Sequence, residues 1–288
     1  MLLAVGSNFG QVKLFDVASG ELVQILVGNS CARGNVHSMK FSPDGTMLVT
    51  GGQSIEEFAK KLADENNIQS ETPKVESGQA ETGQLMIWDI DSGEVKHNLK
   101  GHVSVADVAF SPDGKILVTA GSIIYSGFPE SGPQSGVILW SVETGKQIRT
   151  NILDKNWAGS YSIAVSPDQT RIAVGVYPDK EQERSSIITL SLANMNASGV
   201  VWKRKVPGLN KSVAFMPNSN DIMALFGDRT VKYIGGSGST LMHLTMVDKS
   251  KNGRKTVFAT AKEGDMQLFG GVDENGKGTV DILDLKQE

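Results

Sequence analysis

A short turn sequence recurs along this chain of 288 residues, and it constrains the fold more than any other feature. Proline followed by Asp or Asn closes one apolar segment and opens the next at residues 41–45, 110–114, 165–169 and 215–218. Proline presets φ, and Asp, Asn or Gly tolerates the tight geometry, so each copy predicts a hairpin turn between two strands. A third apolar segment, a second turn and a fourth segment follow. The pattern therefore predicts a repeated four-stranded antiparallel unit.

The prolines of these turns are residues 43, 112, 167 and 217. Without the loop insertions their spacing shrinks toward ~40 residues, the length of a propeller blade. The third segments end in related dipeptides, Trp88-Asp89, Phe15-Asp16 and Trp140-Ser141. One Gly-His pair occurs, Gly101-His102. On these residues the chain resembles the WD-repeat β-propeller family. The resemblance is strong over residues 1–150 and fades beyond them, where Ile188 and Val231 stand at the expected aromatic positions.

The resemblance implies an all-β propeller of about six four-stranded blades, whose strands run a to d from the channel outward. The units fall at 1–28, 35–100, 105–151, 160–207, 211–247 and 255–288. The first unit lacks strand a and the last lacks strand d. Either the ring closes incompletely, or the chain is part of a larger ring of seven or eight blades. Because repeat architectures of this length fold as one unit, a single domain is expected over 1–288.

Composition supports this class and limits the partners. Hydrophobic residues make up 39% of the chain, and 32 glycines supply turns for many short strands. No segment approaches the 18 or more apolar residues that a membrane-spanning helix needs. The first five residues are too short and lack the basic flank of a signal peptide. A single cysteine, Cys31, excludes internal disulfides and fits a reducing compartment, so we expect a cytoplasmic protein.

The longest insertion, residues 53–83, carries the charge imbalance of the whole chain. It holds seven acids and three bases, which equals the net charge of −4, so the remaining residues are formally neutral. A neutral body lacks the basic footprint of a protein that binds nucleic acid or an anionic membrane. Residues 55–64 place Phe58 and Leu62 on one apolar helical stripe. This helix either packs on its own blade or binds a partner, and residues 69–82 have a flexible composition.

Three adjacent blades have long loops between strands b and c, at residues 53–83, 122–136 and 177–185. Strand polarity repeats from blade to blade, so these loops and the d–a loops leave the disc on one face. Long loops inside compact domains are usually functional or disordered. We therefore predict a partner-binding rim, with local loop packing as the alternative. Its candidate residues are apolar or aromatic: Phe58, Leu62, Tyr125, Phe128, Trp157 and Tyr177.

Patterns for cofactor or metal chemistry are weak. Residues 271–278 space glycines and a lysine like a phosphate-binding loop, but Gly278 follows Lys277 and the next segment reads as a strand. The four histidines lack metal-ligand spacing. Asp107 is the best candidate for a polar group in the channel, where it is expected to meet water or backbone amides. We expect no cofactor, no metal and no catalytic residue.

His102 has a structural role by resemblance. In the family this position belongs to a buried hydrogen-bond relay that ties the d–a loop to strand c. The resemblance implies that His102 joins Thr119 or Ser122 and the indole of Trp140. The family's Asp in that relay is expected to be displaced by the insertion at 122–136.

The sequence therefore favours a non-enzymatic scaffold that mediates protein–protein interactions through its rim of long loops. The alternative is a small-molecule-binding or enzymatic propeller with a polar site at the central channel. The expected partners are proteins, with no nucleic acid and no membrane. The chain is expected to be a monomer or a subunit of a complex.

Overall fold

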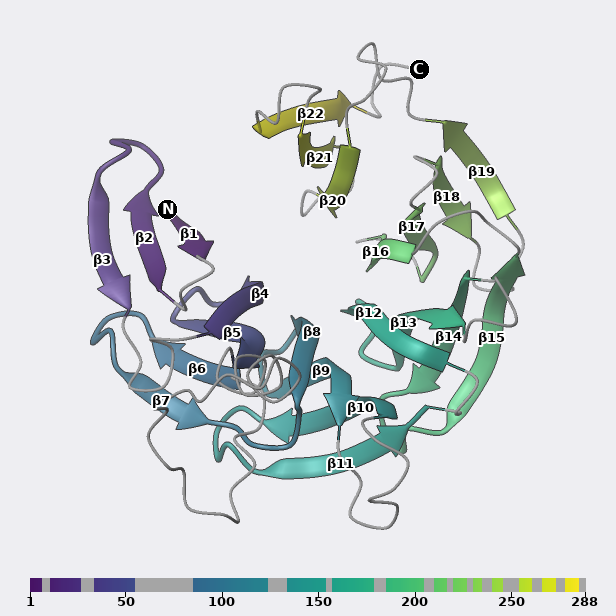
Figure 1. Ribbon diagram of the computed structural model, residues 1–288, viewed down its shortest axis with the longest axis horizontal. Helices are drawn as coiled ribbons and strands as arrows, with labels where there is room; N and C mark the ends of the chain where they lie inside the picture. The colour runs from purple at the N-terminus through teal and green to yellow at the C-terminus, as the bar shows by residue number, and fades with distance from the viewer. Residues whose placement is uncertain are drawn as a thin grey trace, which may run out of the picture. The chain divides into compact units, whose positions relative to one another are not determined.

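The computed structural model is all-β over the residues that it describes (Figure 1). These are residues 1–6, 11–26, 34–54, 85–123, 134–153, 157–178, 185–204, 210–216, 220–226, 230–234, 240–245, 254–260, 266–272 and 278–284. Within these ranges no helix is long and apolar enough to cross a membrane. The helix predicted at 55–64 lies outside the described residues.

The described residues form 22 strands. In the first half of the chain they are β1 (Leu2–Gly6), β2 (Val12–Asp16), β3 (Leu22–Leu26), β4 (Gly34–Phe41), β5 (Met47–Ser54), β6 (Leu85–Asp89), β7 (Val95–Asn98), β8 (Ser104–Phe110), β9 (Ile116–Ile123), β10 (Gln134–Ser141) and β11 (Gln147–Ile152). In the second half they are β12 (Trp157–Val165), β13 (Arg171–Pro178), β14 (Ser185–Ser191), β15 (Ala197–Arg204), β16 (Asn210–Phe215), β17 (Ile222–Phe226), β18 (Thr230–Ile234), β19 (Thr240–Thr245), β20 (Arg254–Thr260), β21 (Met266–Val272) and β22 (Gly278–Asp284).

Consecutive strands pair into small sheets, as the repeat predicts. Sheets β12–β15 and β16–β19 have four strands each, while β1–β3 and β20–β22 have three. The strands β4–β7 and β8–β11 would be two further four-stranded sheets, but one residue pair between β5 and β8 joins them into eight strands. The predicted fold class is confirmed, whereas the number of blades in a ring stays a prediction.

The chain divides into two compact units. The first contains residues 1–110, 114–134 and 138–148, and the second contains 111–113, 135–137 and 149–288. The single domain expected over 1–288 stays a prediction.

The three Ser-Pro-Asp turns join the first two strands of their repeats through a repeated hydrogen-bond network. Ser42 Oγ donates to Asp44 Oδ1 at 2.5 Å, and this carboxylate also accepts from the amide and hydroxyl of Thr46. These donors, Ser42 first, hold the pKa of Asp44 below its ordinary value. Ser166 and Asp168 repeat the bond at 2.6 Å. Gly45 completes the turn at φ 75°, a left-handed conformation that glycine adopts without strain.

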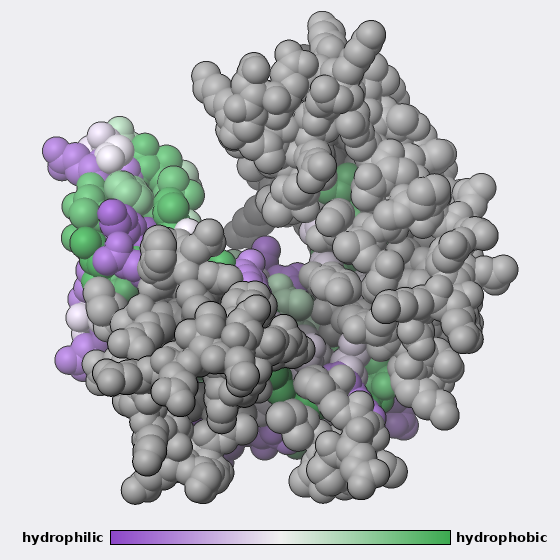
Figure 2. All heavy atoms as spheres, in the orientation of Figure 1, coloured by the Kyte–Doolittle hydropathy of each residue, from purple (hydrophilic) through white to green (hydrophobic). Residues whose placement is uncertain are grey.

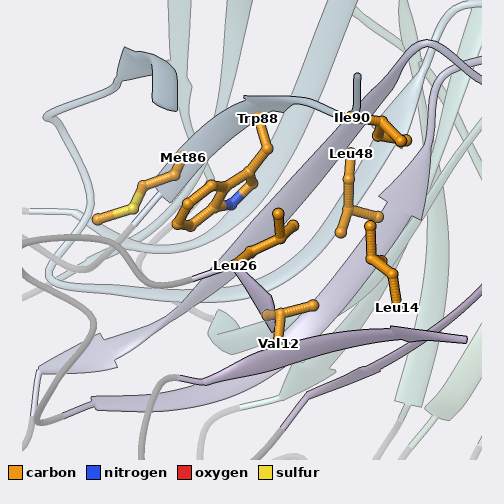
Figure 3. Packing of buried hydrophobic residues seen from close by; sticks show 7 residues of the cluster. All are labelled: Val12, Leu14, Leu26, Leu48, Met86, Trp88 and Ile90. Atoms are coloured by element: carbon orange, nitrogen blue, oxygen red, sulfur yellow. The ribbon is translucent and has the colours of Figure 1, made fainter. Parts of the chain in front are cut away.

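One buried cluster of the first unit lies between the β1–β3 sheet and the β4–β7 sheet (Figure 3). Trp88 and Leu48 of the second sheet are at most 1% exposed and pack against the side chains of the first sheet. The first sheet contributes Val12, Leu14 and Leu26. These residues alternate with others along their strands, as expected where one face of a sheet is buried against a neighbour.

The second unit joins its β12–β15 and β16–β19 sheets by apolar and polar contacts. The apolar cluster contains Ala173, Ile187, Val213, Phe215, Ile222 and Ala224. Asn220 donates from Nδ2 to Asp168 Oδ2 at 2.6 Å, and Arg171 donates to the carbonyl of Asn220 at 3.4 Å. The Arg171 guanidinium also lies 6.0 Å from the centroid of the Phe215 ring. Polar groups of the turns thus link neighbouring sheets at the end of the strands.

The register corrects two aromatic positions assigned from sequence. Leu48 pairs with Trp88 in the second sheet, and the equivalent residues Ile172 and Ile222 pair with Leu190 and Ile234. Leu190 and Ile234 therefore occupy the tryptophan position, and not Ile188 and Val231. The sequence alignment was wrong because each strand contains more than one aliphatic residue that could take this position, Ile187, Ile188 and Leu190 in β14 and Val231 and Ile234 in β18, so the sequence offers no marker of register.

Candidate interaction surface

A β-bulge is present in every described pairing between the first two strands of a complete unit and in β20–β21. Each shifts the register near the start of the inner strand: between Val36 and Ser38, Val105 and Asp107, Ser160 and Ser162, Asn210 and Ser212, and Lys255 and Val257. Bulges bend a strand and increase its twist. The loop-bearing end of each inner hairpin is therefore bent at the same place. This repeat was not predicted, because the bulged residues share no side-chain type.

The residues that follow the bulges connect neighbouring inner strands. Ser38 donates from Oγ to Asp107 Oδ1 at 2.7 Å, which links β4 to β8. Asp107 Oδ1 also accepts from the amide of Val108 at 2.9 Å. In the second unit, the amide of Val213 donates to Ser162 Oγ at 2.8 Å. Asp107, the predicted channel candidate, thus binds a neighbouring hydroxyl and a backbone amide.

Glycines allow β5, β8 and β9 to meet at one point. A Cβ on Gly51 would lie 2.5 Å from Val105 Cγ1, and one on Gly121 would collide with the carbonyl oxygen of Ser104. Because neither position has a Cβ, Gln53 pairs with Ser104, and Ser104 pairs with Ser122. We call this contact the β5–β8–β9 junction, defined by Gln53, Ser104 and Ser122.

The junction is the root of two long insertions. β5 ends at Ser54 and β6 begins at Leu85, while β9 ends at Ile123 and β10 begins at Gln134. Both strands end one residue after the junction and are joined by backbone pairing, and the intervening segments follow directly. The structure thus brings the origins of the first two predicted rim loops together within the first unit.

A buried relay lies beside the junction. His102 Nε2 and Thr119 Oγ1 form a hydrogen bond of 2.8 Å, and Trp140 Nε1 donates to the same Oγ1 at 2.9 Å. Thr119, and not Ser122, is the residue between the ring and the indole. Ser122 instead accepts from the amide of Val103 through its carbonyl at 2.7 Å. The relay therefore fixes the segment before β8 against strand β10.

His102 is buried and incompletely paired. Its side chain is 1% exposed, and Nδ1 has no hydrogen-bond partner among the described residues. Burial lowers the pKa of His102 to about 4, because the imidazolium would lose its hydration. The ring is therefore neutral at pH 7. A second relay has no described histidine: Trp88 Nε1 donates to Thr50 Oγ1 at 2.9 Å.

The predicted rim residues fall into two groups. Phe58, Leu62, Tyr125 and Phe128 lie outside the described residues. Trp157 and Tyr177 are placed by their backbones, in β12 and β13 of the second unit. Trp157 is not in a d–a loop, as the sequence suggested, but begins a strand and pairs with Pro178. Tyr177 pairs with Gly159, so the two aromatic residues lie at the same end of one hairpin.

The described residues contain no group of three or more His, Cys, Asp and Glu side chains that could hold a metal ion. The segment that resembles a phosphate-binding loop connects two strands, β21 and β22, and its residues 273–277 lie outside the described residues. A phosphate-binding loop of that type leads into a helix N-terminus. The strands on both sides do not provide one.

Known proteins resemble this arrangement in sequence and in fold. The family model for the WD domain, G-beta repeat, matches residues 20–54 and 93–122. A chain in the crystal structure of the mitotic checkpoint complex superposes with a TM-score of 0.65 at 17% identity, over 98% of this chain and 73% of that chain. The chain therefore contains WD repeats at these positions, and its fold resembles that of a WD-repeat β-propeller.

The curated relatives match this WD-repeat chain over only part of their length. WD repeat and SOCS box-containing protein 1 of Homo sapiens is 27% identical over 145 residues, which cover 50% of this chain and 25% of that protein. The protein of the same name from Danio rerio is 29% identical over 124 residues, which cover 42% of this chain and 22% of that protein. The matched region thus spans about a quarter of these relatives.

Proposed function

We propose that this WD-repeat propeller is a non-enzymatic scaffold that binds a protein partner through its rim of long loops. WD-repeat proteins are generally protein-interaction scaffolds, and the relatives found here carry that repeat. The observation that carries the proposal for this chain is the β5–β8–β9 junction. It anchors the origins of two long insertions on paired strands, and rigid scaffolds with long loops are a common basis for recognition.

The chemistry at the junction also supports binding rather than catalysis. The side chain of Asp107 already binds Ser38 and the amide of Val108. His102 is buried, with its Nε2 bonded to Thr119. A general base must reach the proton that it removes within hydrogen-bond distance. Asp107 and His102 instead form hydrogen bonds within the scaffold.

A deletion that respects the strand boundaries tests this proposal. Residues 55–83 are replaced by Gly-Ser-Gly-Ser, which preserves the pairing of Gln53 with Ser104. Affinity capture from a cell extract, quantified by mass spectrometry, compares this variant and Trp157→Ala with the intact chain. We expect the melting temperature of both variants to stay unchanged. We expect capture of the partner to be weakened or lost. A central aromatic anchor typically contributes 2 kcal/mol or more, roughly thirtyfold in affinity.

The matched control changes charge at the opposite end of the strands. Lys115 follows a Ser-Pro-Asp turn and its carbonyl accepts from the amide of Val142, so Lys115→Glu keeps the backbone contact. Capture should survive this substitution. If Lys115→Glu abolished capture while the deletion and Trp157→Ala preserved it, the binding surface would lie among the turns and not on the rim.

A further inference from the structure

His102 lies where a change of its charge would act on the β5–β8–β9 junction. It is 1% exposed and belongs to the buried relay beside the junction. The residue after it, Val103, donates from its amide to the carbonyl of Ser122 at 2.7 Å. The following residue, Ser104, pairs with Ser122 and with Gln53. A buried titratable ring is therefore separated by one residue from the junction that joins the ends of β5 and β9.

Close packing prevents the ring from reaching water by a movement of its side chain alone. A Cβ on Gly101 would lie 3.2 Å from Trp140 Cη2, so the backbone before His102 contacts β10. A Cβ on Gly121 would collide with the carbonyl oxygen of Ser104, so the backbone after His102 contacts β9. Interiors packed at this density have no space for a hydrated charge. Hydration of the ring therefore requires this stretch of backbone to leave β9 and β10.

No described carboxylate pairs with the ring to compensate a positive charge. Hydrophilic side chains elsewhere in the unit lie at the surface, as those of the β1–β3 sheet do at the upper left of Figure 2. Strands β5, β9 and β10 contain no charged residue. The titratable residues of β4, of β8 and of the segment before β8 are exposed or already bonded: His37, Lys40, Lys100 and Asp107. An imidazolium at His102 would therefore be buried without a partner charge.

We propose that protonation of His102 opens the β5–β8–β9 junction by detaching residues 101–104 from β9 and β10. A buried charge without a partner is costly, whereas the detached segment is hydrated. The carbonyl of Ser122 favours the protonated ring, but the same oxygen already accepts from Val103, so the protonated ring competes with the bond that closes the junction. Local opening of this kind requires less free energy than global unfolding. The junction is then a pH-sensitive switch at the origins of two insertions.

The direction of the switch follows from proton linkage. Burial lowers the pKa of His102 to about 4, below its ordinary value of 6.5, so the detached segment binds the proton more tightly. The closed junction is fully favoured above pH 6.5 and loses stability as the pH falls from 6.5 toward 4. Between pH 7 and pH 5 the equilibrium constant for opening should rise about twentyfold.

Hydrogen exchange of the intact chain, measured by NMR at pH 7 and pH 5 and expressed as protection factors, tests this switch. The reporters are the Val103 amide and the indole N–H of Trp140. Two groups of the same unit are internal controls: the Leu99 amide, which donates to a carbonyl of β6 at 2.8 Å, and the indole N–H of Trp88, whose relay has no described histidine. We expect protection at Val103 and Trp140 to fall about twentyfold on acidification. Leu99 and Trp88 should keep their protection.

Three variants identify the titrating group. His102→Gln removes the titrating ring but keeps an amide that can bond Thr119, so its Val103 amide should show equal protection at both pH values. The matched control, His97→Gln, removes a histidine of the same unit whose Nε2 is bonded to a backbone carbonyl. Glu130→Gln removes the acid of the insertion after β9. Both controls should keep the wild-type response.

Three results would overturn the proposal: an equal fall in protection at Val103 and Leu99, an unchanged response in His102→Gln, or loss of the response in either control variant. Circular dichroism of each variant checks that it folds. If His102→Gln does not fold, the comparison of Val103 with Leu99 in the wild-type chain still decides.

Capture of a partner at pH 7 and pH 5 is a separate measurement, because it rests on the rim proposed above. Acid should weaken capture by the wild-type chain but not by His102→Gln. The exchange measurement needs no partner, so the two proposals fail separately. Unchanged capture together with the expected change in exchange would contradict the rim as the binding surface and leave the switch established.

Discussion

Threonine and tryptophan occur together in this chain, and the register explains why. Thr50 accepts from Trp88, and Thr119 accepts from Trp140. The equivalent pairs in three other sheets are wholly apolar: Val5 with Phe15, Val174 with Leu190, and Ala224 with Ile234. A buried indole N–H needs an acceptor, whereas replacing both partners with apolar groups is nearly neutral. The two positions therefore change together.

This pairing predicts unequal effects of one substitution at two equivalent sites. Thr119→Val leaves both Trp140 Nε1 and His102 Nε2 without their hydrogen bond, whereas Thr50→Val affects only Trp88 Nε1. Each unsatisfied buried group costs about 1–3 kcal/mol. We expect Thr119→Val to lower the free energy of unfolding by about twice as much as Thr50→Val, measured by urea denaturation. Equal losses would show that the His102 bond contributes nothing.

His102 predicts a loss of stability in mild acid. Its folded pKa of about 4 lies below the ordinary value of 6.5, so the unfolded chain binds the proton more tightly. The contribution of the neutral ring is complete above pH 6.5 and falls as the pH drops from 6.5 toward 4. Between pH 7 and pH 5 the free energy of unfolding should fall by about 2 kcal/mol, at 1.36 kcal/mol per unit.

The measurement is urea denaturation across that pH range for the wild-type chain and for His102→Gln. The described carboxyl groups with a lowered pKa contribute little to this window. Asp168, for example, has a pKa held below its ordinary value of 3.8, mainly by Ser166, so its stabilisation is lost only at lower pH. The variant should be less stable at pH 7 but should lose less stability on acidification. An equal pH dependence in both proteins would exclude His102 as its source.

At the scale of strands, the β5–β8–β9 junction depends on missing side chains. Gly121→Ala would drive a methyl group into the carbonyl oxygen of Ser104. Overpacking of this kind costs about 1–3 kcal/mol. We expect Gly121→Ala to lower stability by that amount and to increase hydrogen exchange at Val103, whose amide donates to Ser122.

A control for Gly121→Ala is Gly45→Ala, because a Cβ there meets nothing within 4 Å and only the φ of 75° is strained. That substitution should cost about 1–2 kcal/mol without changing exchange at Val103. The same exchange pattern in both variants would mean that the junction opens through general destabilisation. In that case Gly121 would have no specific role in positioning the ends of β5 and β9, from which the two insertions start.

Sequence reasoning identified the elements whose signals are local. The Ser-Pro-Asp turns were predictable because Ser42 and Asp44 form their bonds within the turn itself. The role of Trp140 followed from the family resemblance, which left Thr119 and Ser122 as alternatives for the residue between the ring and the indole, and the structure selects Thr119. The bulges were missed because the bulged residues share no side-chain type. The junction was missed because it depends on the pairing of Gln53 with Ser104, which belong to different repeats.

At the scale of the molecule, two compact units raise the question of whether the chain unfolds in one step. The first unit buries Trp88 and Trp140, each bonded to a threonine. The second has the smaller pairs Val174 with Leu190 and Ala224 with Ile234 at the same positions. Large aromatic side chains bury more area than aliphatic ones, and stability grows with buried apolar area. The first unit should therefore resist denaturant longer.

The four tryptophans allow this prediction to be tested, because Trp157 and Trp202 belong to the second unit. In a Trp157→Phe/Trp202→Phe variant, fluorescence reports only on Trp88 and Trp140, whereas far-ultraviolet circular dichroism reports on all strands. We expect the fluorescence midpoint in urea to lie above the dichroism midpoint. Non-coincident probes indicate more than one transition. The dichroism midpoint of the wild-type chain is the control for the effect of the two substitutions on stability. Coincident fluorescence and dichroism curves in the variant would mean that both units unfold cooperatively.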